Sequence, residues 1–219
     1  MKKYLSFSEL NLWYRDRKRY VDYYINGIED TTFNRPLVLG KLIHKIFEEP
    51  RYPWLKELKE MGEWKMVPII HKLLKKVKRE GLAEQTIFAE FEDFKIMAIM
   101  DRYDKKNRFY REYKTYTPEA GEEWSRWTQW KVDHHKQLSF TALVLKLNSY
   151  TYFKEIVLDA IDLAKGNIKS YKTTRGPADL VEITEWIRKG VNEIKVAGLW
   201  DKRLSREERG RLYNLKLPL

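Results

Sequence analysis

The hydrophobic pattern of this chain of 219 residues changes from a helical period to a strand period near residue 86. On the N-terminal side of that point, apolar and aromatic residues recur at helical spacing. This pattern predicts helices over 6–26, 40–49 and, as two pieces, 54–81. Pro68 falls near the start of the last piece. The chain is therefore expected to begin with a helical region.

Beyond the change of period, strand patterns alternate with helical ones. Strands are predicted over 86–94, 95–102, 108–114, 151–159 and 168–174, and helices over 132–148 and 178–197. Residues 104–107 form a turn signal that joins the second and third strands as a hairpin. A central sheet flanked by helices, of the α/β or α+β class, follows.

Charge and cysteine content restrict the partners and cofactors of this fold. The 43 Lys and Arg against 32 Asp and Glu give a formal net charge of +11, which indicates an acidic partner. The sequence has no cysteine, which excludes disulfides, thiolate zinc sites and cysteine-ligated iron–sulfur clusters. Any metal is left to carboxylate and imidazole ligands. Without a signal-like segment or a stretch long enough to span a bilayer, we expect a soluble, cytoplasmic protein without membrane contact.

The stretch with the clearest chemical content lies on the predicted hairpin. Asp101 is on its first strand, and Glu112-Tyr113-Lys114 is on its second. Because side chains alternate along a strand, Glu112 and Lys114 point to one face. Two carboxylates beside a lysine suit metal-assisted hydrolysis of phosphodiesters, in which oxygen ligands hold Mg²⁺ or Mn²⁺ and the ammonium acts on the attacking water. The alternative is a strand pair with ordinary exposed ion pairs.

Asp101 followed by Glu112-Tyr113-Lys114 resembles the signature of the PD-(D/E)XK nuclease superfamily. Three flanking features are similar to its RecB-like branch, which includes CRISPR-adaptation and AddB-type nuclease domains. They are the Gly40–His44 segment, the first helix from Phe7 to Trp13 with Tyr20, and Gln137 at the start of a helix after the lysine strand. The resemblance spans residues 5–145. It implies a restriction-endonuclease-like core of a mixed sheet flanked by helices, in a single domain over 1–219 with a helical insertion around 54–81.

The resemblance also implies a role for each matching residue. Asp101 and Glu112 would be ligands of Mg²⁺ or Mn²⁺, with the backbone carbonyl of Tyr113 as a third ligand and His44 supplying an imidazole. Lys114 would position or activate the nucleophilic water. Gln137 would hold the substrate phosphate or the lysine.

Two departures from the family pattern matter. Thr141 stands four residues after Gln137, where the pattern has a tyrosine, so the contact of this helix with substrate is in question. Several relatives carry an iron–sulfur cluster, and Asp16 stands where its first cysteine would be. Without cysteines the cluster is excluded, so the two ends of the chain must be held together by packing.

Other candidate residues have competing interpretations. Glu90 matches an upstream glutamate used by some relatives, but a strand-edge charge explains it as well. His134 and His135 do not form a metal pair, because adjacent helical residues point about 100° apart. The segment 124–131 places Arg126, Trp127 and Lys131 near the proposed site, where rings and cations could bind nucleic acid. Packing of its tryptophans on the core is the alternative. The basic runs over 15–19 and 72–79 are either solvated faces or tracks for phosphates.

The sequence therefore predicts a metal-dependent DNA nuclease that hydrolyses phosphodiester bonds. By analogy we expect an exonuclease that processes DNA ends in replication, recombination or repair, on single strands or duplexes with ends. One alternative is a catalytically silent nucleic-acid-binding module that keeps the nuclease fold. Another is an interaction subunit whose basic faces meet an acidic protein.

Overall fold

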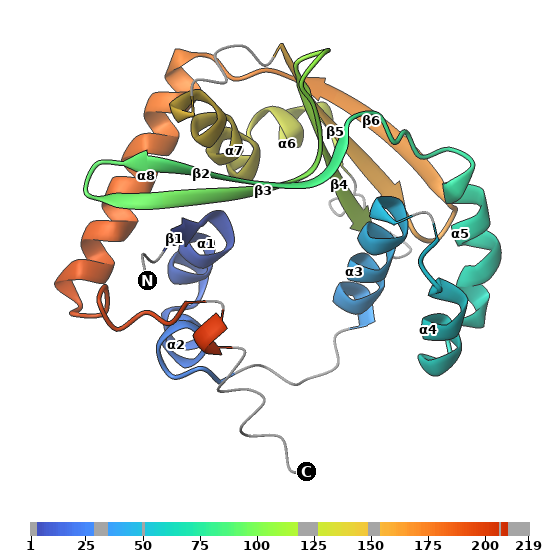
Figure 1. Cartoon of the computed structure of the whole chain (residues 1–219), viewed down its shortest axis with the longest axis horizontal. Coiled ribbons are helices and arrows are strands. Elements are labelled where there is room, and N and C mark those ends of the chain that lie inside the picture. Colours follow the sequence, from blue (N-terminus) through green and yellow to red (C-terminus); the bar gives the residue numbers. More distant parts are fainter. Residues whose placement is uncertain are drawn as a thin grey trace.

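A computed structural model describes residues 4–28, 35–49, 51–117, 127–148, 154–205 and 207–209, and these form a mixed sheet flanked by helices (Figure 1). The strands are β1 (Tyr4–Ser6), β2 (Leu82–Phe91), β3 (Phe94–Asp104), β4 (Phe109–Tyr116), β5 (Glu155–Asp162) and β6 (Asn167–Thr173). The helices are α1 (Phe7–Arg15), α2 (Arg17–Tyr20), α3 (Arg35–Glu48), α4 (Trp54–Glu60), α5 (Val67–Leu74), α6 (Gln129–Asp133), α7 (Lys136–Leu147) and α8 (Pro177–Val196). A π-helix (Val21–Ile25) follows α2 and a 3-10 helix (Trp64–Met66) precedes α5. The predicted fold class is confirmed.

Strand β3 organises the six-stranded sheet because it pairs with three other strands. The strand order is β1-β3-β4-β5-β6, and β2 pairs with β3 outside this path. Since β2 follows one edge of β3 along almost its whole length, β1 and β4 share the opposite edge, at residues 95–97 and 102–104. Between these two pairings β4 separates from β3. The sheet therefore opens at Asp101, the first candidate metal ligand.

Helices cover both faces of the sheet (Figure 1). On one face, α1, α7 and α8 enclose apolar cores that include Tyr110 and Leu158. On the other face, α3, α4 and α5 enclose a core that includes Tyr113 and Ile161. Strands β4 and β5 thus send alternate side chains to opposite cores, as the pleat of a strand requires. Burial on both faces explains why β5 is apolar along most of its length.

Several predicted boundaries are wrong for local reasons. The helix predicted over 6–26 is broken at Asp16, whose side chain accepts from the Arg19 backbone N–H and caps α2. Ser6 caps α1. The helix predicted over 132–148 is divided into α6 and α7 between residues 133 and 136. Polar side chains therefore decide where these helices begin and end.

The strands and the 54–81 segment also differ from the predicted ranges. Strand β2 begins at Leu82, and the turn into β3 lies at Glu92 and Asp93, where Glu92 has a φ of 52°. Helix α5 ends at Leu74, so residues 75–81 are not helical, while Pro68 lies in its first turn as expected. Strand β1 was not predicted, because three residues are too few for a periodic signal.

The N-terminal helices contact α8 and the residues that follow it through both apolar packing and polar bonds. Gly190 allows α8 to lie close to α1, since a Cβ there would be 2.5 Å from the Leu10 Cδ1. Arg203 donates to the buried Glu9 carboxylate at 3.1 Å. The Leu204 N–H donates to the Tyr24 carbonyl at 2.7 Å. The ends are thus joined by a buried ion pair as well as by the expected packing.

Among the residues described, no helix combines the length and apolar character needed to cross a bilayer.

Candidate active site

Asp101 lies at the centre of the candidate site and joins three elements. One of its carboxylate oxygens, Oδ1, is 3.0 Å from Nδ1 of His44 on α3. The other oxygen, Oδ2, accepts from the Tyr113 backbone N–H on β4 at 2.6 Å. The side chain of Asp101 therefore occupies the point where β4 separates from β3. It also holds His44 and Tyr113 in one place, as the sequence motif predicts.

Helix α3 reaches this point because it begins beside β4. A Cβ at Gly40 would lie 2.9 Å from Thr115 Oγ1, so glycine permits the close contact between helix and strand. His44 follows one turn later and faces Asp101. One further turn along the same face, Glu48 lies beside both. The Gly40–His44 spacing therefore has a packing function as well as a chemical one.

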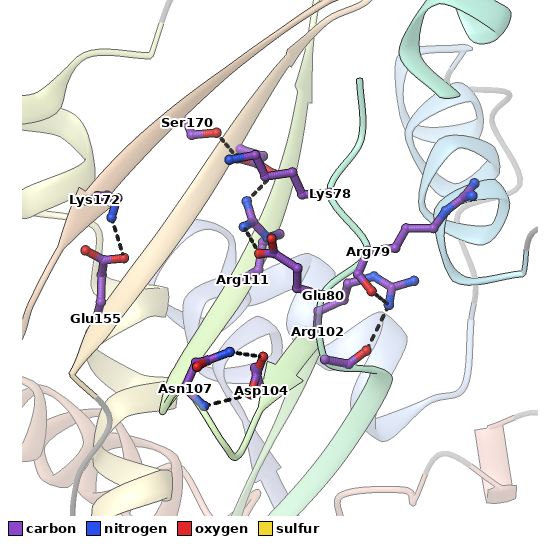
Figure 2. A network of polar contacts seen from close by, with 12 residues as sticks. Lys78, Arg79, Glu80, Arg102, Asp104, Asn107, Arg111, Glu155, Ser170 and Lys172 are labelled. Atoms are coloured by element: carbon purple, nitrogen blue, oxygen red, sulfur yellow. Dashed lines mark hydrogen bonds and ion pairs between the residues drawn. The ribbon is translucent and has the colours of Figure 1, made fainter. Parts of the chain in front are cut away.

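A strap formed by residues 78–81 supports the site on the α3 side, as Figure 2 shows in part. The Tyr113 hydroxyl donates to the Lys78 carbonyl at 2.8 Å. Arg102, which is 5% exposed, donates to the carbonyls of Arg79 at 2.9 Å and Gly81 at 3.0 Å. Its other terminal nitrogen donates to the Phe47 carbonyl, in the last turn of α3, at 2.8 Å. Arg102 therefore fixes the end of α3 against β3, next to Asp101.

A second group of residues comes from β4 and the start of α7. The Lys114 ammonium donates to Glu112 Oε1 at 2.8 Å and to the Gln137 side-chain oxygen at 2.9 Å. The Gln137 amide nitrogen donates to the same Glu112 oxygen at 2.6 Å. Glu112 is only 3% exposed. The three side chains thus form a closed set of hydrogen bonds around one carboxylate oxygen.

The remaining oxygen of Glu112 bears on whether the residues fit a metal. Among the described residues, Oε2 of Glu112 is buried and has no hydrogen-bond partner. A buried carboxylate oxygen without a donor is costly, and a cation would remove the cost. Carboxylate oxygens together with one imidazole suit Mn²⁺, and the carboxylate oxygens also suit Mg²⁺. The residues therefore fit a hard divalent cation.

Charges in the site shift the ionisation of its members. Burial lowers the pKa of His44, but the hydrogen bond and negative charge of Asp101 outweigh burial and raise that pKa overall. Burial also lowers the pKa of Lys114, and Glu112 more than reverses this effect. Burial raises the pKa of Glu112, which Lys114 opposes and Asp101 reinforces. Lys114 is therefore held as a cation beside the carboxylates.

Glu48 is a member of the site that the sequence did not identify. Ligand atoms of His44, Glu48 and Asp101 all lie within 4.8 Å of one another. Burial raises the pKa of Glu48 to about 7, and the charges of Glu84 and Asp101 add to this effect. Glu84 lies on β2 between Ala83 and Gln85, whose β3 partners, Arg102 and Met100, flank Asp101, and it has a φ of 41°. The spacing of His44 and Glu48 on one helix was visible in the sequence, but their shared neighbour on β3 was not.

Two other candidates lie away from this cluster. Glu90 is exposed and forms an ion pair with Lys95, in agreement with the strand-edge interpretation. Thr141 is 2% exposed, so this position of α7 faces the core.

The aromatic and basic segment before α7 is divided between core and surface. Trp127 is half-buried, its ring lies 5.2 Å from that of His135, and its carbonyl accepts from the Tyr171 hydroxyl. Trp130 is 68% exposed and stacks on His134. Lys131 is half-buried on α6. Trp127 therefore packs on the core, while Trp130 faces solvent. Trp124 and Arg126 lie outside the described residues.

Part of the basic run over 72–79 serves the fold. Lys72 donates to the Lys165 carbonyl at 2.7 Å, and Lys76 donates to the Asn167 side chain at 2.8 Å. The first bond ties α5 to the turn between β5 and β6, and the second ties the segment after α5 to the first residue of β6. These two lysines are therefore engaged with the protein itself.

Comparison with known proteins supports the fold. No protein-family model and no curated protein matches the chain. A crystal structure from Eubacterium rectale, described as a "Putative exonuclease", has a TM-score of 0.64 and 14% identity, covering 88% of this chain and 80% of that one. The crystal structure of SSO0001 has a TM-score of 0.51 and 16% identity, covering 87% of this chain and 76% of that one. At these identities the likeness shows a shared fold and leaves the chemistry to the site itself.

Proposed function

We propose that the protein is a metal-dependent nuclease that hydrolyses phosphodiester bonds in DNA, of the RecB-like branch of the PD-(D/E)XK superfamily. The observation that carries this proposal is the meeting of motif residues from separate segments. Asp101 contacts both His44 and the Tyr113 backbone, while Lys114 is held between Glu112 and Gln137. A pair of strands with only surface ion pairs would not bury Glu112 or draw α3 and α7 toward the same point.

Some of these residues would hold a cation, and the others would place the reactants. Asp101, Glu112, the Tyr113 carbonyl and His44 would hold Mg²⁺ or Mn²⁺, which supplies an activated water and stabilises developing charge. Lys114 has two hydrogen-bond acceptors, so its position is fixed toward the site and its charge is available to a phosphate or a water. Gln137 orients Lys114 and Glu112 together. Water and phosphate would enter beside His44 and Asp101, whose side chains are partly accessible.

The substrate we propose is DNA with an end, either single-stranded or duplex. The net charge of +11 favours a polyanion, and the fold resembles that of a protein described as an exonuclease. Trp130 offers an exposed ring for stacking, near Lys131 and in the same segment as Arg126. We expect the activity to serve replication, recombination or repair.

End-labelled linear DNA and closed circular DNA, single- and double-stranded, provide the test. With Mn²⁺ or Mg²⁺ we expect stepwise products from linear substrates and slow or absent loss of circles, and with a chelator no products at all. Rapid loss of circles would replace the exonuclease by an endonuclease. Binding of DNA with no cleavage under any divalent cation would favour the silent binding module instead.

A further inference from the structure

Helix α3 presents a second potential ligand beside His44. Glu48 is half-buried, and its carboxylate shares a cluster with the His44 ring and the Asp101 carboxylate in which ligand atoms lie within 4.8 Å of one another. Oxygen ligands stand at about 2.0–2.6 Å from Mg²⁺ or Ca²⁺. Two ligands on opposite sides of one ion are therefore separated by about 4–5 Å, so the observed spacing can accommodate a cation.

The cluster has charge that its own members do not neutralise. Glu48 and Asp101 place two carboxylates beside one imidazole, and Glu112 interacts electrostatically with Asp101. Lys114 is already engaged by Glu112 and Gln137. Glu84 on β2 adds a further carboxylate, whose negative charge acts on Glu48. Crowding of like charges in a partly buried site is unfavourable. A divalent cation between α3 and β3 would offset it.

A separate observation points to the same place. Oε2 of Glu112, on a side chain that is 3% exposed, has no hydrogen-bond partner among the described residues. Glu112 interacts electrostatically with both Asp101 and His44, so this oxygen belongs to the same electrostatic environment as the α3 cluster. A buried oxygen of this kind is what a cation would satisfy and what a cluster of surface acids does not contain.

We propose that Glu48 is a ligand of a divalent cation, which it holds together with His44 and Asp101. This inference rests on the proposed metal-dependent function and adds a ligand that the sequence motif does not contain. It makes α3 the principal cation-holding element, since His44 and Glu48 occupy successive turns of one helix face. The spacing His-x-x-x-Glu then has a direct chemical reason.

Calorimetric titration of the full chain with Mn²⁺ tests the proposal, with Glu49→Gln as the matched control. Glu49 is the exposed neighbour of Glu48, so both substitutions remove one carboxylate from the same end of α3. We expect Glu48→Gln to weaken Mn²⁺ binding by at least about tenfold, a size typical of lost coordination support. Glu49→Gln should bind as wild type does. Equal Mn²⁺ affinity of the two variants would overturn the proposal while leaving the proposed nuclease untouched, because cleavage by wild type is measured separately.

A second pair of variants, in which cysteine replaces each glutamate, keeps the proposal testable if Glu48→Gln folds poorly. Because the chain has no cysteine, Glu48→Cys would introduce its only thiol, and thiolates favour Zn²⁺ over Mn²⁺. We expect Glu48→Cys to bind Zn²⁺ at least about tenfold more tightly than Glu49→Cys does. Equal Zn²⁺ affinity of the two cysteine variants would contradict a ligand at position 48. Failure of wild type to bind Mn²⁺ at all would remove both this inference and the proposed function.

Discussion

The two halves of the candidate site differ in how their charges are balanced. In the α3–β3 half, His44, Glu48 and Asp101 form a cluster of carboxylate and imidazole ligands that contains no lysine or arginine. In the β4–α7 half, Glu112 is matched by Lys114 and fixed by Gln137. The first half has the composition of a cation-binding site, whereas the Glu112 carboxylate of the second half is already paired with the Lys114 ammonium. The difference suggests that the α3–β3 half contributes ligands alone, whereas the β4–α7 half contributes the Glu112 ligand together with the side chains that place the reactants.

Substitution of Lys114 should give the largest difference between the effect on cleavage and the effect on metal binding. We expect Lys114→Ala to reduce cleavage by roughly a hundred- to a thousandfold, as for loss of a fixed charge that stabilises a transition state. Its Mn²⁺ affinity should not fall, because Lys114 is not among the proposed ligands of the cation. Cleavage rates and calorimetry together check this. Lys146→Ala, on the exposed last turn of the same helix that carries Gln137, should leave both unchanged.

Substitution of Arg102 should disturb the geometry that joins the halves. Arg102→Met would leave the carbonyls of Phe47, Arg79 and Gly81 without this buried donor, and we expect a loss of roughly 3 kcal/mol in the free energy of unfolding. Arg188, whose ion pairs are exposed, is the control, and Arg188→Met should cost less than about 1 kcal/mol. Urea denaturation measures both. Equal losses would show that the strap does not depend on Arg102.

Substitution of Gln137 should act on the second half alone. Gln137→Ala removes one acceptor from Lys114 and one donor from Glu112, and we expect cleavage to fall by roughly ten- to a hundredfold. The midpoint of Mn²⁺ dependence should stay where it is in wild type. A shift of that midpoint as large as the one caused by Glu48→Gln would mean that the halves do not act separately.

Two histidines report the opposite electrostatic fields of the halves. Asp101 raises the pKa of His44 against the effect of burial, whereas burial, with the charges of Lys114 and Arg175, lowers the pKa of His135 to about 4. His44 therefore stabilises the fold at low pH and loses this effect as pH rises through its raised pKa. The neutral state of His135 stabilises the fold above pH 6.5, and this effect is lost as pH falls toward 4.

Titration of the imidazole signals by NMR in the cation-free protein checks this contrast. The two signals are assigned by their loss in His44→Gln and His135→Gln. We expect the His135 signal to titrate below pH 5 and the His44 signal to titrate above 6.5, the ordinary value for histidine. Matching midpoints would contradict the electrostatic difference between the halves.

Much of the fold could be predicted because its elements carry local signals. The predicted ranges overlap β2 to β6, α3 and α8, since alternation and helical periodicity are properties of short segments. The division between α6 and α7 could not be predicted in this way. There Arg175, distant in sequence, donates to the carbonyls of Val132 at 2.9 Å and His135 at 3.4 Å. A tertiary contact thus holds both sides of the break, in addition to the backbone N–H groups that these carbonyls already accept.

The site was predictable to the extent that its residues belong to a motif. His44, Asp101, Glu112, Lys114 and Gln137 were chosen from sequence, and the structure brings them together. Glu48 was missed because its role depends on Asp101 across the contact between α3 and β3. Arg102 was not predicted because most arginines are exposed, and the sequence does not reveal that this one is buried. Long-range contacts of this kind have no sequence periodicity.

Cleavage of end-labelled linear DNA by wild type and Asp101→Asn, in one Mn²⁺ buffer and with a chelator control, tests the central claim most directly. Asp101 contacts both His44 on α3 and the Tyr113 backbone on β4. We predict that wild type releases products only when the divalent cation is present, and that Asp101→Asn releases none above background. Cleavage by Asp101→Asn at the wild-type rate, or by wild type in the presence of the chelator, would contradict a metal-dependent nuclease site at this position.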